Sequence, residues 1–272
     1  MDAARETKRI QIGDYHGEIV GLTNCGYFNT LPTQFGEHNS LFKFMKLINF
    51  APHTVFDVGA NIGLFTIAAA TQLPDAKIAS YEPNPQVAEC LTVNTKPWRD
   101  RVMTKQCALG ARKGEAMFFP GISRTSGAHL MDQAEWRGSG YSVPISTIDN
   151  EMAELGFESL DLLKIDVEGY EQDVLDGAAT TLARCQPLIH LEVNSWCLIA
   201  MRNLNPRTFV ESLGAKFAHV YHCRKDGGFK RLETQYDRMM FLHENLTVNG
   251  CVDDLIVTNL HLRNAASLDR AD

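Results

Sequence analysis

The chain has 272 residues, of which 44% are hydrophobic and 22% charged, which is ordinary for a globular enzyme and fits one large α/β domain with an extension. Its formal net charge of −7 argues against non-specific binding to the phosphate backbone of nucleic acids. No apolar run reaches the length of a membrane span, so we expect neither a nucleic-acid nor a membrane partner.

Residues 1–50 are predicted to form an N-terminal extension, helical and hairpin-like, that caps the core. The alternating pattern around residues 17–20 is typical of an edge hairpin. Ser40 can cap a helix that runs to Ile48, because apolar residues recur there at helical spacing and Pro52 ends the segment. Residues 51–272 are expected to form the main domain.

Strands and helices alternate along the main domain. The predicted strands are 54–58, 77–81, 102–109, 160–166 and 187–193. The predicted helices are 62–72, 85–94, 169–183 and 206–213. This alternation predicts an α/β fold with a doubly wound, mostly parallel seven-stranded sheet. A hairpin over 217–223 and 229–232 predicts an antiparallel edge near the end of the chain.

A glycine-containing loop insert, residues 120–144, interrupts the alternation. Long inserts without regular structure in compact domains are usually functional lids or mobile segments. Three side chains of the insert, Arg124, His129 and Trp136, are therefore candidates for substrate contact. Trp136 does not identify the substrate, because aromatic rings stack on sugars and on bases alike.

The most informative stretch is residues 57–63, Asp-Val-Gly-Ala-Asn-Ile-Gly, where a buried strand runs through a glycine turn into a helix. Glycines allow a ligand to approach the backbone closely. Glu82 follows the next strand, and a carboxylate there faces the turn and can hold a ribose by its hydroxyls. The pattern predicts a nucleoside-containing cofactor.

The turn also bears on which cofactor binds. Asn61 stands where the dinucleotide fingerprint has its second glycine, and Asp57 would repel a pyrophosphate. An acid there suits the cationic amino-acid tail of S-adenosylmethionine. An NAD-dependent oxidoreductase and a non-catalytic binding protein on the same type of fold remain as alternatives.

Three segments, residues 57–63, 81–84 and 163–169, resemble the FkbM family of class I S-adenosylmethionine-dependent methyltransferases. The resemblance extends over about residues 55–193 and more weakly through 217–232, and residues 1–50 match nothing. It implies a Rossmann-like fold and transfer of a methyl group to a hydroxyl of a sugar or secondary metabolite. The expected partner is thus a small-molecule or glycan acceptor.

Ligands of open α/β sheets bind beyond the carboxyl ends of the strands, so residues there are the site candidates. For the cofactor they are Asp57, Gly59, Asn61, Gly63, Glu82, Pro83, Asn84, Cys107, Ala108 and Asp166, with Cys107 and Ala108 at the place where the family's fold holds adenine.

Methyl transfer to an alcohol needs a base for the hydroxyl proton. The candidates are Glu192, Asp166 and His190, with Glu192 preferred because His190 lies in the middle of its strand. Glu168 and Asn194 are the candidates for acceptor contact at the ends of the same strands.

A divalent metal is an alternative that we do not favour. Asp166, Glu192 and Asn194 supply three oxygen ligands that suit magnesium. Some small-molecule methyltransferases hold this ion with an acid after strand four and an acid–amide pair after strand five. Here Val193 separates the acid from the amide, so the pattern departs from theirs.

The compartment follows from the cysteines and the N-terminus. Seven cysteines are scattered without a C-x-x-C pair, which favours reduced thiols over disulfides or a zinc site. The first residues are charged and lack the apolar core of a signal peptide. We expect a cytoplasmic protein, and the sequence leaves open whether it forms a homo-oligomer.

Overall fold

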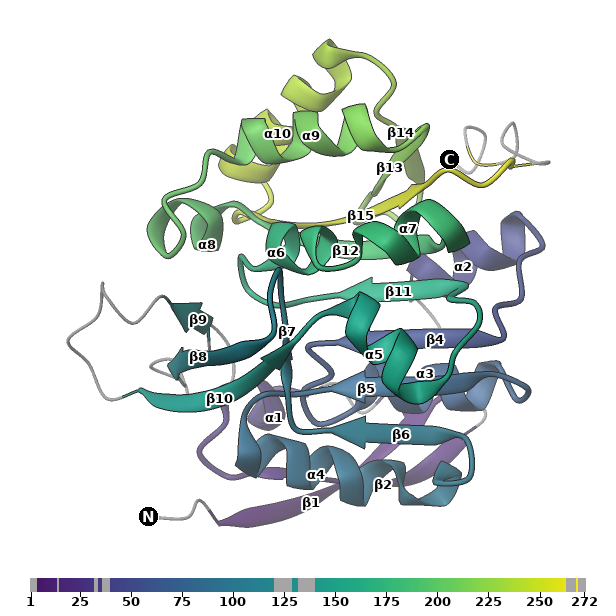
Figure 1. The fold of residues 1–272 in the computed structure, drawn as a ribbon, viewed down its shortest axis with the longest axis vertical. Helices are drawn as coiled ribbons and strands as arrows, with labels where there is room; N and C mark the ends of the chain where they lie inside the picture. Colours follow the sequence, from purple (N-terminus) through teal and green to yellow (C-terminus); the bar gives the residue numbers. More distant parts are fainter. Residues whose placement is uncertain are drawn as a thin grey trace.

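The computed structural model describes residues 4–13, 15–31, 34–35, 40–119, 129–131, 140–262 and 268. A central sheet with helices on both faces organises the chain (Figure 1). Its strands are β4 (Thr54–Val58), β5 (Lys77–Tyr81), β6 (Val102–Lys105), β11 (Leu162–Ile165), β12 (Leu188–Asn194), β13 (His219–Cys223), β14 (Phe229–Arg231) and β15 (Val252–Thr258). Their order is β14-β13-β15-β12-β11-β4-β5-β6.

The predicted fold class is confirmed, with one more strand than expected. Strands β6, β5, β4, β11 and β12 pair in parallel, and the predicted hairpin β13–β14 forms the antiparallel edge. The additional strand is β15, which pairs antiparallel with both β12 and β13. It was missed because Asp253 and Asp254 interrupt its apolar run.

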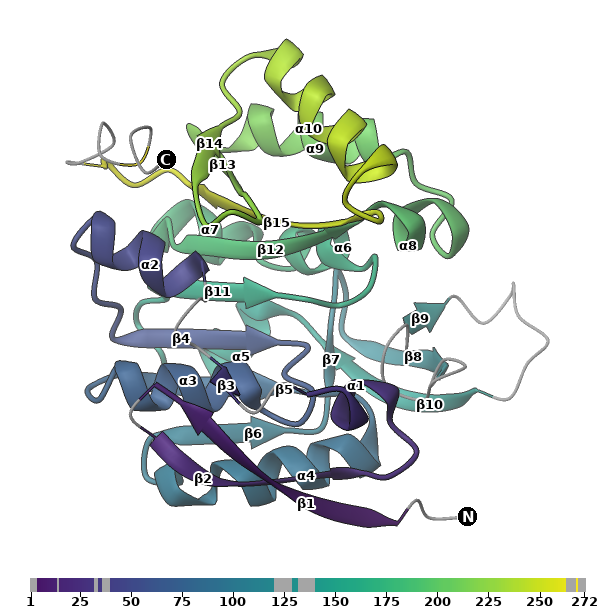
Figure 2. The same ribbon diagram turned by 180° about the vertical axis from the view of Figure 1, so that it is seen from behind.

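Helices cover the two faces of the sheet unequally (Figures 1 and 2). One apolar cluster contains residues of α2 (Ser40–Leu47), α3 (Leu64–Gln72) and α4 (Pro85–Thr95). The cluster on the other face contains residues of α5 (Ile148–Leu155), α6 (Glu171–Asp176), α9 (Pro206–Lys216) and α10 (Gln235–Thr247). The remaining helices are α1 (Gly26–Asn29), α7 (Ala179–Cys185), α8 (Ser195–Ala200) and a 3-10 turn at Lys96–Trp98.

The helix predicted over 169–183 is interrupted. It is divided into α6 and α7, with Gly177 and Ala178 between them. A Cβ on Gly177 would lie 2.0 Å from the carbonyl oxygen of Gly110, so only glycine lets the backbones meet there. None of the helices in the part of the chain that the structure describes is long and apolar enough to cross a membrane.

The N-terminal residues pack on the same face as α3 and α4. Strands β1 (Arg5–Ile12) and β2 (Tyr15–Leu22) form the hairpin that the alternation predicted, and β3 (Gln34–Phe35) extends it. Ile12 and Ile19 belong to the same apolar cluster as Val55 of β4. The Asn94 side chain in α4 accepts a 2.7 Å hydrogen bond from the backbone amide of Val20 and donates a 2.9 Å hydrogen bond to its carbonyl. These bonds attach the extension to α4 of the main domain.

A second sheet lies beyond the carboxyl ends of the parallel strands (Figure 1). It contains β7 (Ala108–Leu109), β8 (Gly114–Phe119), β9 (His129–Met131) and β10 (Tyr141–Ser146), in the order β7-β10-β8-β9. Two expectations are corrected here. The strand expected over 102–109 is broken into β6 and β7, and the insert 120–144 contributes β9 and part of β10 instead of being wholly a loop.

Candidate functional site

A row of polar side chains crosses the central sheet just before the strands end. Ser80, Asp57, Lys164 and His190 are in register across β5, β4, β11 and β12, so their side chains share one face. It is the face that the N-terminal extension covers, because His190 is also paired with Ile256 of that apolar cluster. We call this row the polar floor: Lys164 and His190 reach the cavity of the site, whereas Ser80 and Asp57 are buried outside its lining.

Lys164 holds the floor together. Its ammonium lies 3.2 Å from Asp57 and 3.4 Å from Asp166, and it donates a 2.9 Å hydrogen bond to the carbonyl of Gly59. Burial opposes its charge, but the two carboxylates outweigh burial and raise the pKa of Lys164 above its ordinary value. The lysine therefore stays protonated. A lone lysine within the apolar strand Leu-Leu-Lys-Ile was a signal that the sequence analysis overlooked.

Asp57 does not have the surroundings that its motif predicted. Its side chain is fully buried and is absent from the lining of the cavity. One carboxylate oxygen accepts a 2.6 Å hydrogen bond from Thr66, and the other faces Lys164. The predicted contact of Asp57 with a cationic ligand stays a prediction: its carboxylate already faces Lys164, and Asp57 is not among the residues that line the cavity.

The glycine turn is shaped by close packing of the protein itself. Gly59, Asn61 and Gly63 all have positive φ, at 76°, 50° and 95°. A Cβ on Gly59 would lie 1.8 Å from the carbonyl oxygen of Asp166, and one on Gly63 would lie 2.8 Å from Leu91. Gly59 and Asn61 line the cavity, whereas Gly63 packs α3 against α4 and does not.

Glu82 braces the turn from the end of β5. One carboxylate oxygen accepts a hydrogen bond from the amide of Asn61 at 3.0 Å, and the other accepts one from the amide of Asn84 at 2.9 Å. Asn84 in turn caps α4. Burial raises the pKa of Glu82 to about 7, even though both amides favour its charged form.

These elements enclose a cavity of about 570 Å³ at the carboxyl ends of the strands, a size typical of small-molecule sites. The predicted residues that line it are Gly59, Asn61, Glu82, Pro83, Asn84, Cys107, Ala108, Asp166, Glu168, His190 and Glu192. The sequence analysis missed Tyr27, Phe118, Lys164 and Asp254. Tyr27 comes from α1 in the N-terminal extension, and burial raises its pKa to about 12.

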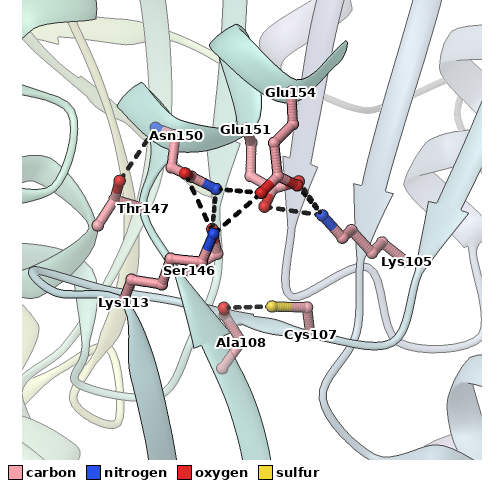
Figure 3. Close-up of polar contacts among 9 residues, drawn as sticks. All are labelled: Lys105, Cys107, Ala108, Lys113, Ser146, Thr147, Asn150, Glu151 and Glu154. Carbon is pink, nitrogen blue, oxygen red and sulfur yellow. Dashed lines mark hydrogen bonds and ion pairs between the residues drawn. The ribbon is translucent and has the colours of Figure 1, made fainter.

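A polar network joins Lys105, at the end of β6 near the Cys107–Ala108 wall, to α5 (Figure 3). Lys105 donates to both carboxylate oxygens of Glu151 at 2.9 and 2.8 Å, and to Glu154 at 2.8 Å. Glu151 is fully buried, so this ion pair ties the end of β6 to α5. Burial raises the pKa of the Cys107 thiol to about 11, which keeps the wall uncharged.

The ends of β11 and β12 are joined through Glu168. Its carboxylate accepts hydrogen bonds from the Asn194 amide at 3.0 Å and from the Cys197 thiol at 3.1 Å. Asn194 also caps α8 and is not part of the cavity lining, and its predicted contact with the acceptor stays a prediction. No cluster of three His, Cys, Asp or Glu that could hold a metal is found among the described residues.

Glu192 and His190 retain unpaired polar atoms inside the cavity wall. Within the described ranges of the chain, a buried carboxylate oxygen of Glu192 and Nδ1 of His190 have no hydrogen-bond partner, and His190 Nε2 lies 3.8 Å from Asp254. Burial, followed by the charges of Asp166 and Glu168, raises the pKa of Glu192 well above its ordinary value. Burial lowers the pKa of His190. Both groups are therefore available to a bound molecule.

Three predicted contacts come from the insert. Arg124 and Trp136 lie outside the described residues, and His129 begins β9. None of the three roles is tested by the described part of the chain.

Residues 57–217, more than half of the chain, match the family model of the methyltransferase FkbM domain. The chain belongs to this family. Among curated FkbM-type relatives, the 31-O-demethyl-FK506 methyltransferase FkbM of Streptomyces tacrolimicus is 28% identical over 151 residues, which cover 45% of this chain and 58% of the relative.

Two further relatives are 30% identical to this FkbM-family chain. The 2-O-methyltransferase NoeI of Sinorhizobium fredii aligns over 48% of the chain and 59% of its own length. The hexuronic acid methyltransferase AglP of Haloferax volcanii aligns over 47% of the chain and 51% of its own length. The chain thus spans about half of the length of the relatives it matches.

Proposed function

We propose that this chain is an S-adenosylmethionine-dependent O-methyltransferase that acts on a hydroxyl of a sugar or secondary metabolite. One observation carries the proposal. The cavity that contains the FkbM glycine turn and Glu82 also contains Glu192, whose buried carboxylate oxygen has no hydrogen-bond partner in the described part of the chain. A cofactor subsite and a proton acceptor thus share one enclosure.

The residues present fit the cofactor. Glu82 would accept the ribose hydroxyls, because each of its oxygens accepts one backbone amide and keeps a further lone pair. The uncharged Cys107–Ala108 wall suits adenine. Asp166, at the far side of the turn, would attract the cationic amino-acid end. When bound, the cofactor supplies a methyl group on a positively charged sulfur.

Glu192 is the proposed general base. Burial raises the pKa of Glu192 well above its ordinary value, and a carboxylate with a raised pKa is a stronger base than an ordinary one. It would take the hydroxyl proton as the new carbon–oxygen bond forms. His190, on the same face of β12, is the alternative base, since it is neutral and its Nδ1 is unpaired.

The acceptor class is proposed from the relatives. Two of the three carry O-methylation in their names and the third carries a hexuronic acid, so a hydroxyl on a sugar or a natural product is the common theme. None of the seven cysteines forms a disulfide, which supports a reducing compartment such as the cytoplasm.

Calorimetry with S-adenosylmethionine, S-adenosylhomocysteine and NAD in parallel tests the cofactor. We expect S-adenosylhomocysteine to bind in the micromolar range or tighter, roughly −8 kcal/mol or better. Tighter binding of NAD would make the chain an oxidoreductase instead. Binding of none of the three would leave a non-catalytic relative of the family.

A further inference from the structure

Two carboxylates face each other across the wall of the cavity where β12 meets β15. Glu192 and Asp254 are directly opposite partners in this antiparallel pair, and both line the cavity. Like charges directly opposite on neighbouring strands destabilise a sheet. One oxygen of Glu192 is buried and has no hydrogen-bond partner among the residues that the structure describes.

The described part of the site offers no spare cation to balance these acids. Lys164 is the one lysine or arginine among the described lining residues, and its ammonium already contacts Asp57, Asp166 and the carbonyl of Gly59. His190 lies 3.8 Å from Asp254, and its environment favours the neutral ring. The wall is therefore complementary to a positively charged group on a bound molecule.

We propose that the acceptor is a vicinal amino alcohol, as in a 2-amino sugar, whose ammonium binds Asp254 while its neighbouring hydroxyl faces Glu192. The inference rests on the proposed function and adds the chemical class of its acceptor. Adjacent substituents on one carbon–carbon bond match two carboxylates that project side by side from paired strands.

The same wall selects against anionic acceptors. A carboxylate on the acceptor would meet Glu192 and Asp254, and no free cation among the described lining residues could receive it; like-charge juxtaposition is a strong source of discrimination. This chain thus differs in acceptor charge from AglP, which is named for a hexuronic acid.

The test uses the full chain saturated with S-adenosylhomocysteine. It is titrated with the methyl glycosides of glucosamine, glucose and glucuronic acid, and binding is followed by calorimetry or ligand-observed NMR. We expect glucosamine to bind about tenfold or more tighter than glucose, and glucuronic acid to bind weakest. Added salt should reduce the preference, because Asp254 is partly exposed.

The variant D254N should abolish the preference for the amine and leave binding of S-adenosylhomocysteine unchanged. D75N is the matched control, because it removes the same charge at a site away from the cavity. Asp75 is exposed, precedes β5 and does not line the cavity. It should behave as wild type. Unchanged S-adenosylhomocysteine affinity also shows that D254N is folded.

The outcomes separate the two proposals. Failure to bind S-adenosylhomocysteine overturns the proposed function and the acceptor class with it. If S-adenosylhomocysteine binds normally, three results overturn the acceptor class alone. They are binding of glucuronic acid as tight as that of glucosamine, binding of none of the three glycosides, and a preference for the amine that persists in D254N.

Discussion

Replacing Glu82 by alanine should separate the two roles that the structure gives this side chain. The carboxylate accepts hydrogen bonds from the amides of Asn61 and Asn84, and it is the group proposed to receive the ribose. We expect Glu82→Ala to weaken binding of S-adenosylhomocysteine by about 1.5–3 kcal/mol, the usual scale for a hydrogen bond to a charged group.

The same substitution should also destabilise the cofactor-free protein. The backbone amides of Asn61 and Asn84 lose their hydrogen-bond acceptor, at a cost of about 1 kcal/mol each. Part of this loss is offset because the variant no longer buries a carboxylate. A net loss of about 1–2 kcal/mol in the free energy of unfolding is expected. Urea unfolding without ligand measures this, and calorimetry measures the affinity.

Glu82→Gln is the matched comparison. It keeps the size and one acceptor oxygen, so it should brace the turn better than alanine while still losing most of the ribose affinity. Wild-type affinity for S-adenosylhomocysteine in both variants would refute the ribose contact. Unchanged unfolding in Glu82→Ala would refute the brace.

Three further substitutions or titrations test the site. Lys164→Met should lower the free energy of unfolding by about 3–5 kcal/mol, because it leaves Asp57 buried without a cation, and adding Asp57→Asn should recover much of the loss in urea unfolding. Glu192→Gln should reduce turnover on the order of a hundredfold with unchanged S-adenosylhomocysteine affinity, measured in chelator. Near-wild-type turnover would show that Glu192 is not the base and would point to Asp166 or His190. Burial raises the pKa of Glu82 to about 7 in the folded chain, so folding favours its protonated form. This contribution to stability is complete below the ordinary carboxyl pKa and is lost as pH rises through about 7. Because glutamine does not titrate, the free energy of unfolding of cofactor-free Glu82→Gln should change less between about pH 5 and about pH 8 than that of wild type. A variant curve parallel to that of wild type would show that Glu82 does not titrate in this range.

The sequence predicted well those features that depend on neighbouring residues. Strands β4 and β5 have the predicted bounds, and the turn and Glu82 meet as their motifs required. Alternation of buried and exposed positions, glycine at positive φ and a cap before a proline act over a few residues. Such signals can be interpreted without knowing what packs against them.

Tertiary structure decided which of the candidate side chains reach the cavity. Tyr27 and Asp254 arrive from opposite ends of the chain, the first because the extension packs on the main sheet and the second because β15 inserts between β12 and β13. Asp57 forms an ion pair with Lys164, and the Asn194 amide donates a hydrogen bond to Glu168.

The physical reason is that strand order and long-range packing are set by the sum of many weak contacts, with no local motif for any of them. From the sequence alone followed the fold class, the glycine turn, Glu82 and the acidic strand ends. The cross-strand pairing of Glu192 with Asp254, and with it the charge of the cavity wall, exists only once β12 and β15 lie side by side.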